Sequence, residues 1–165
     1  MARRDGLAAL ALLLVLAATP ATALAQRDVG PVRVALFAGV HLGHDTRPLL
    51  GLAGELELRG TWSLAIVAST LSQRDGTYAQ YEVEARWRPL GEGRVRPYLG
   101  AGAVAARSSF IASGGPATTR FGALALAGVE VPLLGTTSFL EALALEDGGF
   151  SAQLRGGVRL LLIGK

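Results

Sequence analysis

The stretch His-Leu-Gly-His-Asp, from His41 to Asp45, holds the residue types in this chain that most readily support chemistry. Two histidines three positions apart beside an aspartate can bind a metal ion, and a histidine next to a serine can activate it for attack on an ester. No further ligand and no matching acid stands at a recognisable spacing. We therefore expect an unreactive His41 inside the fold, a solvated His44 and Asp45, and no catalytic or metal-binding residues.

Glu82 and Glu84 form the second candidate, because side chains two positions apart share one face of a strand. Two carboxylates can perform acid-base catalysis where a substrate enters between them. The surrounding residues favour a narrow barrel whose interior is filled by side chains, so we expect no substrate cleft and no enzymatic activity. The glycine-rich stretches lack the strand-to-helix context that phosphate binding requires, and no cofactor is predicted.

The composition indicates a single folded domain. The chain has 165 residues, of which 50% are hydrophobic and 18% charged, and this balance separates it from disordered chains. It has no cysteine, which excludes disulfides and thiolate metal sites. The formal net charge of +3 arises mainly from dispersed arginines, so the basic patch expected of a nucleic-acid-binding protein is missing.

The first 25 residues have the order of a secretory signal peptide. Arg3 and Arg4 precede an apolar run over residues 7–18, and the small residues 23–25 then lead into Gln26. The apolar run is shorter than the ~20 residues of a membrane-spanning helix. We expect cleavage after residue 25, with a mature domain over residues 26–165 that folds outside the cytoplasm.

The mature chain shows alternation of period two. From Ala79 to Pro89, in AQYEVEARWRP, apolar and polar residues alternate without interruption, as in a strand with two chemically different faces. Most such segments are near the ~9–11 residues that a tilted strand needs to cross a bilayer. The predicted strands cover residues 32–42, 50–59, 62–69, 79–89, 95–103, 120–131, 140–145 and 150–162.

The charges lie on one face of these strands, and the other faces carry no charged residue before Glu146. A membrane barrel would show this pattern, since an Arg or Lys facing lipid costs about 2–4 kcal/mol at the bilayer centre. A soluble barrel would show the same separation of charged and apolar faces, with the apolar faces inside and the charged faces outside. Small residues beside the long charged ones favour the membrane barrel, because an eight-stranded interior is only wide enough for side chains to fill. The predicted lumenal network, balanced in sign, comprises Arg33, Glu55, Glu57, Arg59, Glu82, Glu84, Arg86, Arg96, Glu130, Glu141, Arg155 and Arg159.

The connections predict an orientation. Short turns are expected near residues 60–61, 90–93 and 134–136, and longer loops over residues 43–48, 72–76, 107–118 and 147–149. In bacterial barrels the short turns are periplasmic and the longer loops extracellular, which places both ends of the mature chain in the periplasm. The predicted aromatic girdle consists of Trp62 and Trp87 at the periplasmic interface and Phe121 and Phe150 at the outer one.

Two stretches carry a resemblance to a known family. RPYLGAGA, from Arg96 to Ala103, is similar to a strand written Pro-Tyr-hydrophobic-Gly-x-Gly, and LRGGVRLLL, from Leu154 to Leu162, resembles a closing strand. The chain thereby resembles the small eight-stranded outer-membrane β-barrel proteins of Gram-negative bacteria, the group of the OmpA transmembrane domain and the OmpX-like proteins. The resemblance implies an all-β, antiparallel, up-and-down transmembrane barrel that follows a cleavable signal peptide. It also implies a recognition signal for the barrel assembly machinery, carried by Arg155, Gly157, Leu160 and Leu162.

These observations predict a non-enzymatic barrel in the outer membrane that contacts lipid and the assembly machinery and contributes to envelope structure or surface interaction. The loop from Ser108 to Thr119 is the candidate contact for a surface partner. One alternative is a lipid-modifying enzyme, because some members of the resembling group deacylate or acylate lipid A, with His41 and His44 as the residues to test. The other is a soluble periplasmic barrel that binds an apolar ligand. A porin is disfavoured because water-filled channels need ~16 or more strands.

Overall fold

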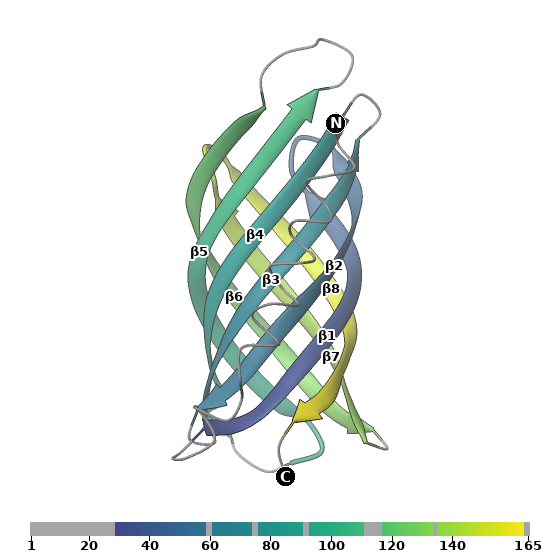
Figure 1. The fold of residues 1–165 in the computed structure, drawn as a ribbon, viewed down its shortest axis with the longest axis vertical. Coiled ribbons are helices and arrows are strands. Elements are labelled where there is room, and N and C mark those ends of the chain that lie inside the picture. Colours follow the sequence, from purple (N-terminus) through teal and green to yellow (C-terminus); the bar gives the residue numbers. More distant parts are fainter. Residues whose placement is uncertain are drawn as a thin grey trace.

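The structure, a computed structural model, describes residues 29–58, 61–73, 76–90, 93–110, 117–133 and 135–163. Within these residues it shows eight strands and no helix long and apolar enough to span a membrane (Figure 1). The predicted signal peptide lies outside the described residues. The strands are β1 (Val29–Leu42), β2 (Thr46–Leu58), β3 (Trp62–Gln73), β4 (Gly76–Trp87), β5 (Arg96–Phe110), β6 (Thr118–Leu133), β7 (Thr136–Glu146) and β8 (Phe150–Ile163).

Each strand pairs antiparallel with the next one in the chain, and β8 pairs with β1 to close the barrel. β1 begins and β8 ends at the same end of the barrel, where Val32 pairs with Ile163 (Figure 1). We call this the Trp end, because β3 begins there with Trp62 and β4 ends there with Trp87, and the opposite end, with His41, the His end. The predicted all-β, antiparallel, up-and-down barrel of eight strands is confirmed.

The register fixes the tilt of the strands. A path that passes from each residue to its direct partner on the next strand starts at Val32 on β1. After one turn around the barrel it reaches β1 again, but at Leu42. The intervening residues are Leu56, Leu64, Ala85, Ala101, Ala125, Ala144 and Ala152. A closed sheet whose register advances along the strand in this way has strands inclined to its axis, in general by ~35–45°. Figure 1 shows that the strands are inclined.

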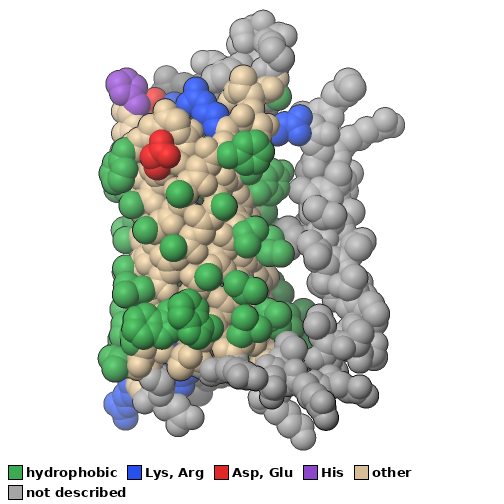
Figure 2. All heavy atoms as spheres, turned by 90° about the vertical axis from the view of Figure 1, so that its left-hand side faces the viewer, with side chains coloured by type: hydrophobic (Ala, Val, Ile, Leu, Met, Phe, Trp, Pro, Cys, Tyr) green, Lys and Arg blue, Asp and Glu red, His purple; other side chains and the backbone are tan. Residues whose placement is uncertain are grey.

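The alternation of the strands separates an apolar outer wall from a lumen. Leu36, Leu50 and Val83 point outward with 56%, 63% and 57% of their surface exposed, whereas their neighbours Ala35 and Glu82 are buried inside. Figure 2 shows the resulting wall: apolar side chains spread over its height, and the charged side chains gather near the two ends. This distribution is the reverse of a water-soluble protein, which buries its large apolar side chains.

The lumen holds more than charges. One apolar cluster comprises Ala35, Phe37, Leu49, Ala53, Ala65, Val67, Leu71 and Phe139. A second comprises Tyr98, Val104, Leu124, Leu126, Leu143 and Leu145. The alternation of β6 is ambiguous at Leu124 and Leu126, and the structure shows both side chains inside, so apolar packing fills the parts of the lumen that the charged network does not.

The strands differ from their predicted bounds mainly by being longer. β2 begins at Thr46 rather than Leu50, and β5 continues to Phe110 rather than ending at Ala103. The backbone ladder continues where the side-chain alternation stops, because hydrogen bonding between strands does not require an apolar face. The predicted difference in connection length holds only in part. Residues 59–61 and 134–135 are short connections at the Trp end, as predicted, but residues 88–95 are a longer one there, and residues 43–45 and 147–149 are short connections at the His end.

Candidate functional site: a buried charge network in the lumen

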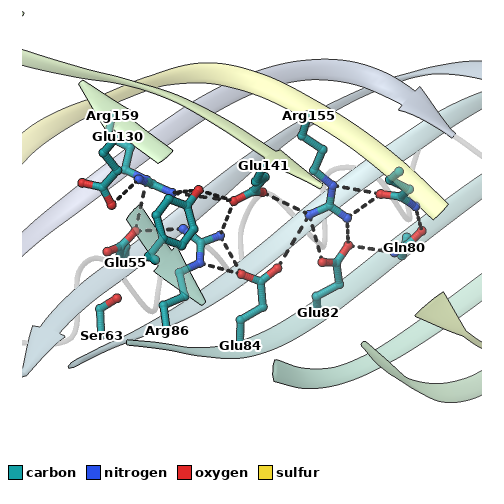
Figure 3. Close-up of polar contacts among 12 residues, drawn as sticks. Glu55, Ser63, Gln80, Glu82, Glu84, Arg86, Glu130, Glu141, Arg155 and Arg159 are labelled. Atoms are coloured by element: carbon teal, nitrogen blue, oxygen red, sulfur yellow. Dashed lines mark hydrogen bonds and ion pairs between the residues drawn. The ribbon is translucent and has the colours of Figure 1, made fainter. Parts of the chain in front are cut away.

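The middle of the lumen is occupied by charged side chains from strands on every side of the barrel (Figure 3). β4 contributes three, β8 two, and β2, β6 and β7 one each, and the chain just past β4 adds one more. None has more than 5% of its surface exposed. We call this set the lumenal network; it consists of Glu55, Glu82, Glu84, Arg86, Arg88, Glu130, Glu141, Arg155 and Arg159.

Arg88 anchors the network toward the Trp end. Its Nε and Nη2 donate to Oε1 of Glu130 at 3.0 and 2.8 Å, its Nη1 donates to Ser63 Oγ at 2.8 Å, and its Nη2 also contacts Glu55. Arg159 reaches the same two carboxylates, with Nε 3.2 Å from Glu55 Oε2 and Nη1 2.6 Å from Glu130 Oε1. Two guanidinium groups are thus clamped between two carboxylates in a space closed to water.

Arg86 occupies the centre. Its Nε donates to Glu84 Oε2 at 2.7 Å and its Nη1 to Glu55 Oε2 at 3.0 Å, while its Nη2 lies 3.5 Å from Glu141 Oε2. Because Glu84 and Arg86 are two positions apart on β4, their side chains point into the lumen together, and this contact follows directly from the strand geometry.

Arg155 anchors the network toward the His end. Both of its Nη atoms contact the Glu82 carboxylate, Nη1 at 2.9 Å from Oε2, and its Nε donates to Gln153 Oε1 at 2.9 Å. Gln80 donates to Glu82 Oε1 at 2.8 Å and accepts from Gln153 at 2.9 Å, which closes a ring of hydrogen bonds (Figure 3). Planar bidentate pairing of this kind is the strongest contact that a guanidinium makes with a carboxylate.

Aromatic rings line the same space. The Tyr98 hydroxyl donates to Glu141 Oε2 at 2.7 Å and accepts from Arg159 Nη2 at 3.0 Å. The guanidinium carbon of Arg159 lies 4.2 Å from the centre of the Phe139 ring, and that of Arg155 lies 5.2 Å from the centre of Phe37. The rings favour these cations electrostatically and exclude water from them.

The structure brings together most of the residues proposed for the network but not all. Arg33 pairs with Glu57 at 2.6 Å nearer the Trp end, apart from the central contacts. Arg96 donates instead to the carbonyl of Gly93 at 3.3 Å at the exposed end of β5, so its inclusion was wrong. Arg59 lies outside the described residues.

Sequence reasoning missed several participants. Arg88 alternates in step with the lumenal residues of β4, but it stands just before Pro89, at the end of the predicted strand. Nothing in the neighbouring sequence indicates that its side chain turns back into the barrel to contact Glu55. The same alternation places three uncharged residues on the inward faces of their strands: Tyr98, Gln80 and Gln153. This alternation could have predicted that they lie in the lumen. Uncharged hydrogen-bonding partners were not included in a set selected by charge.

The described residues enclose a cavity at each end of the lumen. A cavity of about 440 Å³ at the His end has His41, His44, Arg47 and Asp147 in its lining, and one of about 350 Å³ at the Trp end is lined in part by Arg33. The lumenal network lies between them. A charged, buried plug thus separates these two cavities, which we call the vestibules.

The residues that first suggest chemistry do not form a reactive group. His41 Nδ1 lies 3.2 Å from the amide nitrogen of Gln153, while His44 is exposed in the connection after β1. Asp45 pairs with Arg47 at 2.7 Å, and this hydrogen bond with its positive charge lowers the pKa of the Asp45 carboxyl. Among the described residues no three His, Asp or Glu side chains gather into a metal site.

The residues proposed for the girdle all point outward. Trp62 and Trp87 pair across β3 and β4 at the Trp end and stack, with ring centroids 6.3 Å apart and an interplanar angle of 29°. Phe121 and Phe150 each have 79% of their surface exposed, near the His end. Large aromatic side chains displayed to the outside at both ends of a barrel are typical of membrane barrels, where they lie at the headgroup level.

The residues of the proposed assembly signal point in the directions that the alternation predicts, whereas the proposed surface loop is shorter than predicted. Arg155 of the signal is a fully buried member of the network, whereas Leu160 and Leu162 are exposed on the outer wall. The two ends of the loop predicted from Ser108 to Thr119 belong to strands, because β5 extends to Phe110 and β6 begins at Thr118. Residues 111–116, including Ile111, lie outside the described residues.

Comparisons with solved structures identify the fold. The crystal structure of Neisserial surface protein A is 17% identical and matches 82% of this chain and 100% of that chain, with a TM-score of 0.72. The N-terminal β-barrel domain of Pseudomonas aeruginosa OprF is 16% identical and matches 81% and 100%, with a TM-score of 0.66. The outer membrane protein OprG from Pseudomonas aeruginosa is 12% identical and matches 81% and 94%, with a TM-score of 0.56.

The protein-family models and curated proteins that were compared with the chain give no match. The likeness to the solved barrels shows that the chain has the fold of a small eight-stranded outer-membrane β-barrel, as its sequence resemblance implied.

Proposed function

We propose that this chain is a non-enzymatic β-barrel protein of a Gram-negative outer membrane, with a closed lumen and a role in envelope structure or surface interaction. The observation that carries the proposal is the inverted distribution of side chains: leucines and valines cover the outside, while nine charged groups are buried within. Lipid solvates such an outer wall, whereas water would penalise it, since burial of apolar surface is worth roughly 25 cal/mol per Å².

The filled lumen supports a structural role rather than transport. Network side chains such as Arg155 and Glu84 have no exposed surface and contact partners from the opposite wall. Water-filled channels through barrels come with ~16 or more strands, and an eight-stranded barrel has room only for its own side chains. The surfaces left for interaction are the outer wall and the two vestibules.

An enzymatic role at the His end is the first rival. Ser151 lines the same cavity as His41, which is the arrangement an esterase would use. The described hydrogen bonds join His41 to Gln153 and not to Ser151, so the base and nucleophile of such a site are not engaged with each other. Replacing His41 and His44 with Ala should leave the mass spectrum of lipid A unchanged in cells that express the protein; loss of a lipid A mass change on this substitution would instead support the rival.

A soluble barrel that binds an apolar ligand is the second rival. It would need an apolar cavity inside and a polar wall outside, whereas Glu82 and Arg86 are inside and Leu64 and Ile66 outside. Osmotic shock would release such a protein from the periplasm. We expect this chain to stay with the outer-membrane fraction and to need detergent for extraction.

Heat-modifiable migration tests the proposed closed membrane barrel. The detergent-extracted protein, loaded on a gel without boiling, should migrate differently from a boiled sample, because a closed barrel resists detergent until it is heated. Identical migration of both samples, together with release of the protein by osmotic shock, would overturn the proposal.

A further inference from the structure

The vestibule at the His end has two walls of different chemistry. Leu71, Tyr78 and Ala106 line it from β3, β4 and β5, whereas His41 lines it from β1 and Asp147 from the connection that precedes β8. Because β8 lies opposite β4 and β1 opposite β5 in the closed barrel, these two sets face each other across the lumen. One wall is mostly apolar, and the other carries hydrogen-bonding groups.

A chain of hydrogen bonds fixes which nitrogen of His41 carries its hydrogen. The Nε and Nη2 atoms of Arg155 both donate to Gln153 Oε1, at 2.9 and 2.6 Å. A guanidinium group has no acceptor, so the Gln153 amide must turn its nitrogen away from Arg155, toward His41 Nδ1 at 3.2 Å. An amide nitrogen only donates, and Nδ1 is therefore the acceptor. The neutral His41 ring thus carries its hydrogen on Nε2.

The Nε2–H group of His41 faces a space that Gly43 leaves open. A Cβ atom at Gly43 would lie only 2.8 Å from His41 Nε2, and both residues line the vestibule. The hydrogen bonds among the described residues engage the His41 ring through Nδ1 and not through Nε2. His41 therefore offers an oriented, uncharged donor to a molecule in the vestibule.

Asp147 supplies an acceptor that is also held in place. The Tyr78 hydroxyl reaches across from β4 and donates to Asp147 Oδ2 at 2.7 Å. Within the described part of the chain no side chain donates to Oδ1, so the carboxylate has capacity for a ligand. The Arg120 guanidinium lies beside the same connection, since a Cβ atom at Gly148 would come within 3.3 Å of its Nη1.

The charged groups around the vestibule occur in both signs. Asp45 pairs with Arg47 at 2.7 Å, and Arg120 lies beside the connection that carries Asp147. Residues 74–75, between β3 and β4 and outside the described residues, are an arginine and an aspartate, which add no net charge. A small anion would approach Asp147, a small cation would approach Arg120, and no three described His, Asp or Glu residues form a metal site. This arrangement favours a neutral ligand with several hydrogen-bonding groups.

We propose that the vestibule at the His end binds a neutral saccharide. A sugar hydroxyl both donates and accepts, so neighbouring hydroxyls pair with the Asp147 carboxylate and with His41 Nε2–H together. The C–H face of a pyranose ring is apolar and fits the opposite wall, formed by Leu71 and the Tyr78 ring. The cavity of about 440 Å³ is within the ~300–1,000 Å³ of small-molecule sites. The proposal rests on the proposed role in surface interaction and names the chemistry of the partner.

Binding of defined sugars by the wild-type barrel in phosphatidylcholine nanodiscs tests the ligand class. An array of immobilised neutral, sulfated and sialylated glycans is probed with the labelled barrel, and free maltose and lactose are titrated by saturation-transfer NMR. Binding to neutral glycans on the array indicates a ligand on a surface, and binding to the free disaccharides alone indicates a soluble sugar; either result supports the site. A barrel with heat-modifiable migration that binds only sulfated or sialylated glycans, or none of these probes, overturns the site and leaves the proposed membrane barrel intact.

Two adjacent carboxylates provide a matched pair of variants for the location of the site. Asp147→Asn removes the charged acceptor of the vestibule and should bind the neutral sugar about tenfold or more weakly. Glu146→Gln makes the same change one residue earlier, at an exposed position on the outer wall, and should bind like wild type. Equal affinities for the two variants would place the sugar elsewhere and overturn the proposal.

A third variant fills the site without removing a polar group. Gly43→Ala places a methyl group against His41 Nε2 and should weaken sugar binding while Asp147 stays intact. Heat-modifiable migration verifies that each variant is folded, so this variant decides the question if Asp147→Asn does not fold. A folded Gly43→Ala barrel with wild-type affinity would show that the sugar does not enter the space beside His41, and the proposal would be wrong.

Discussion

Arg155 holds the carboxylate of Glu82 with both of its terminal nitrogens, and both side chains are fully enclosed in the lumen. Such a pair stabilises the fold only while both charges are present, because either charge alone would be left in a dry interior. The contact joins β8 to β4 across the barrel, so it also sets the distance between opposite walls.

A double-mutant cycle should expose this dependence. Arg155→Met or Glu82→Leu alone should lower the free energy of unfolding by about 3–5 kcal/mol, because each leaves the partner charge uncompensated. The double variant should be closer to wild type than either single variant. Urea unfolding in lipid vesicles measures all four proteins, and strictly additive losses would show that the pair is not coupled.

A charge on the outer wall should be costly. Ala125 is exposed near the middle of β6 and pairs with Ala101 and Ala144 on the neighbouring strands. Ala125→Arg should destabilise the vesicle-embedded barrel by about 2–4 kcal/mol, the cost of an arginine facing the bilayer centre. The control is His44→Arg, at an exposed position between β1 and β2, which should change little. Equal unfolding midpoints for the two variants would indicate that water, not lipid, surrounds Ala125.

Gly102 should tolerate no side chain. A Cβ atom there would collide with the backbone carbonyl of Val83 and lie 3.0 Å from the Cα of Glu84, both on the paired strand β4. Gly102→Ala should destabilise the barrel by about 1–3 kcal/mol through this overpacking. Gly54 has open space at its Cβ position, so Gly54→Ala is the matched control. Chemical unfolding of both variants measures the difference, and equal stabilities would contradict the close approach of β4 and β5.

The chain has two tryptophans, Trp62 and Trp87, and both lie on the outer wall at the Trp end. Their fluorescence therefore reports the depth of one interface without any labelling. Lipids that carry a quencher near the headgroup should quench the emission more than lipids that carry it near the chain terminus. Stronger quenching from the membrane centre, or none from lipid, would contradict their proposed place in the girdle.

The alternation of residue types was sufficient to predict the eight strands and the direction in which most side chains point. Glu82, Glu84 and Arg86 share a parity that places them in the lumen without any knowledge of long-range contacts. The lumenal positions of Leu124 and Leu126 were not predictable, because both faces of β6 are apolar there and alternation cannot distinguish inside from outside.

The details of the network depended on information that alternation does not contain. Which arginine contacts which glutamate depends on which residues of opposite walls, such as β4 and β8, come to the same height in the closed barrel, and on side-chain length. Arg88 joins the network from a position just past β4, and Arg96 misses it at the exposed start of β5. Both differences occur at strand ends, where a long side chain can turn either into the lumen or out to water.

The placement of lipid around the outer wall is tested most directly by single cysteines in this naturally cysteine-free chain. Cysteines at Leu64, Val83 and Leu154, which have 45%, 57% and 44% of their surface exposed, would be treated in intact membranes with a water-soluble thiol reagent, beside a control cysteine at Gly149 in the connection between β7 and β8. We predict that the control reacts and the three wall positions stay unlabelled until the protein is unfolded. Rapid labelling of the wall positions in the folded protein would show that water covers them and would contradict a membrane barrel.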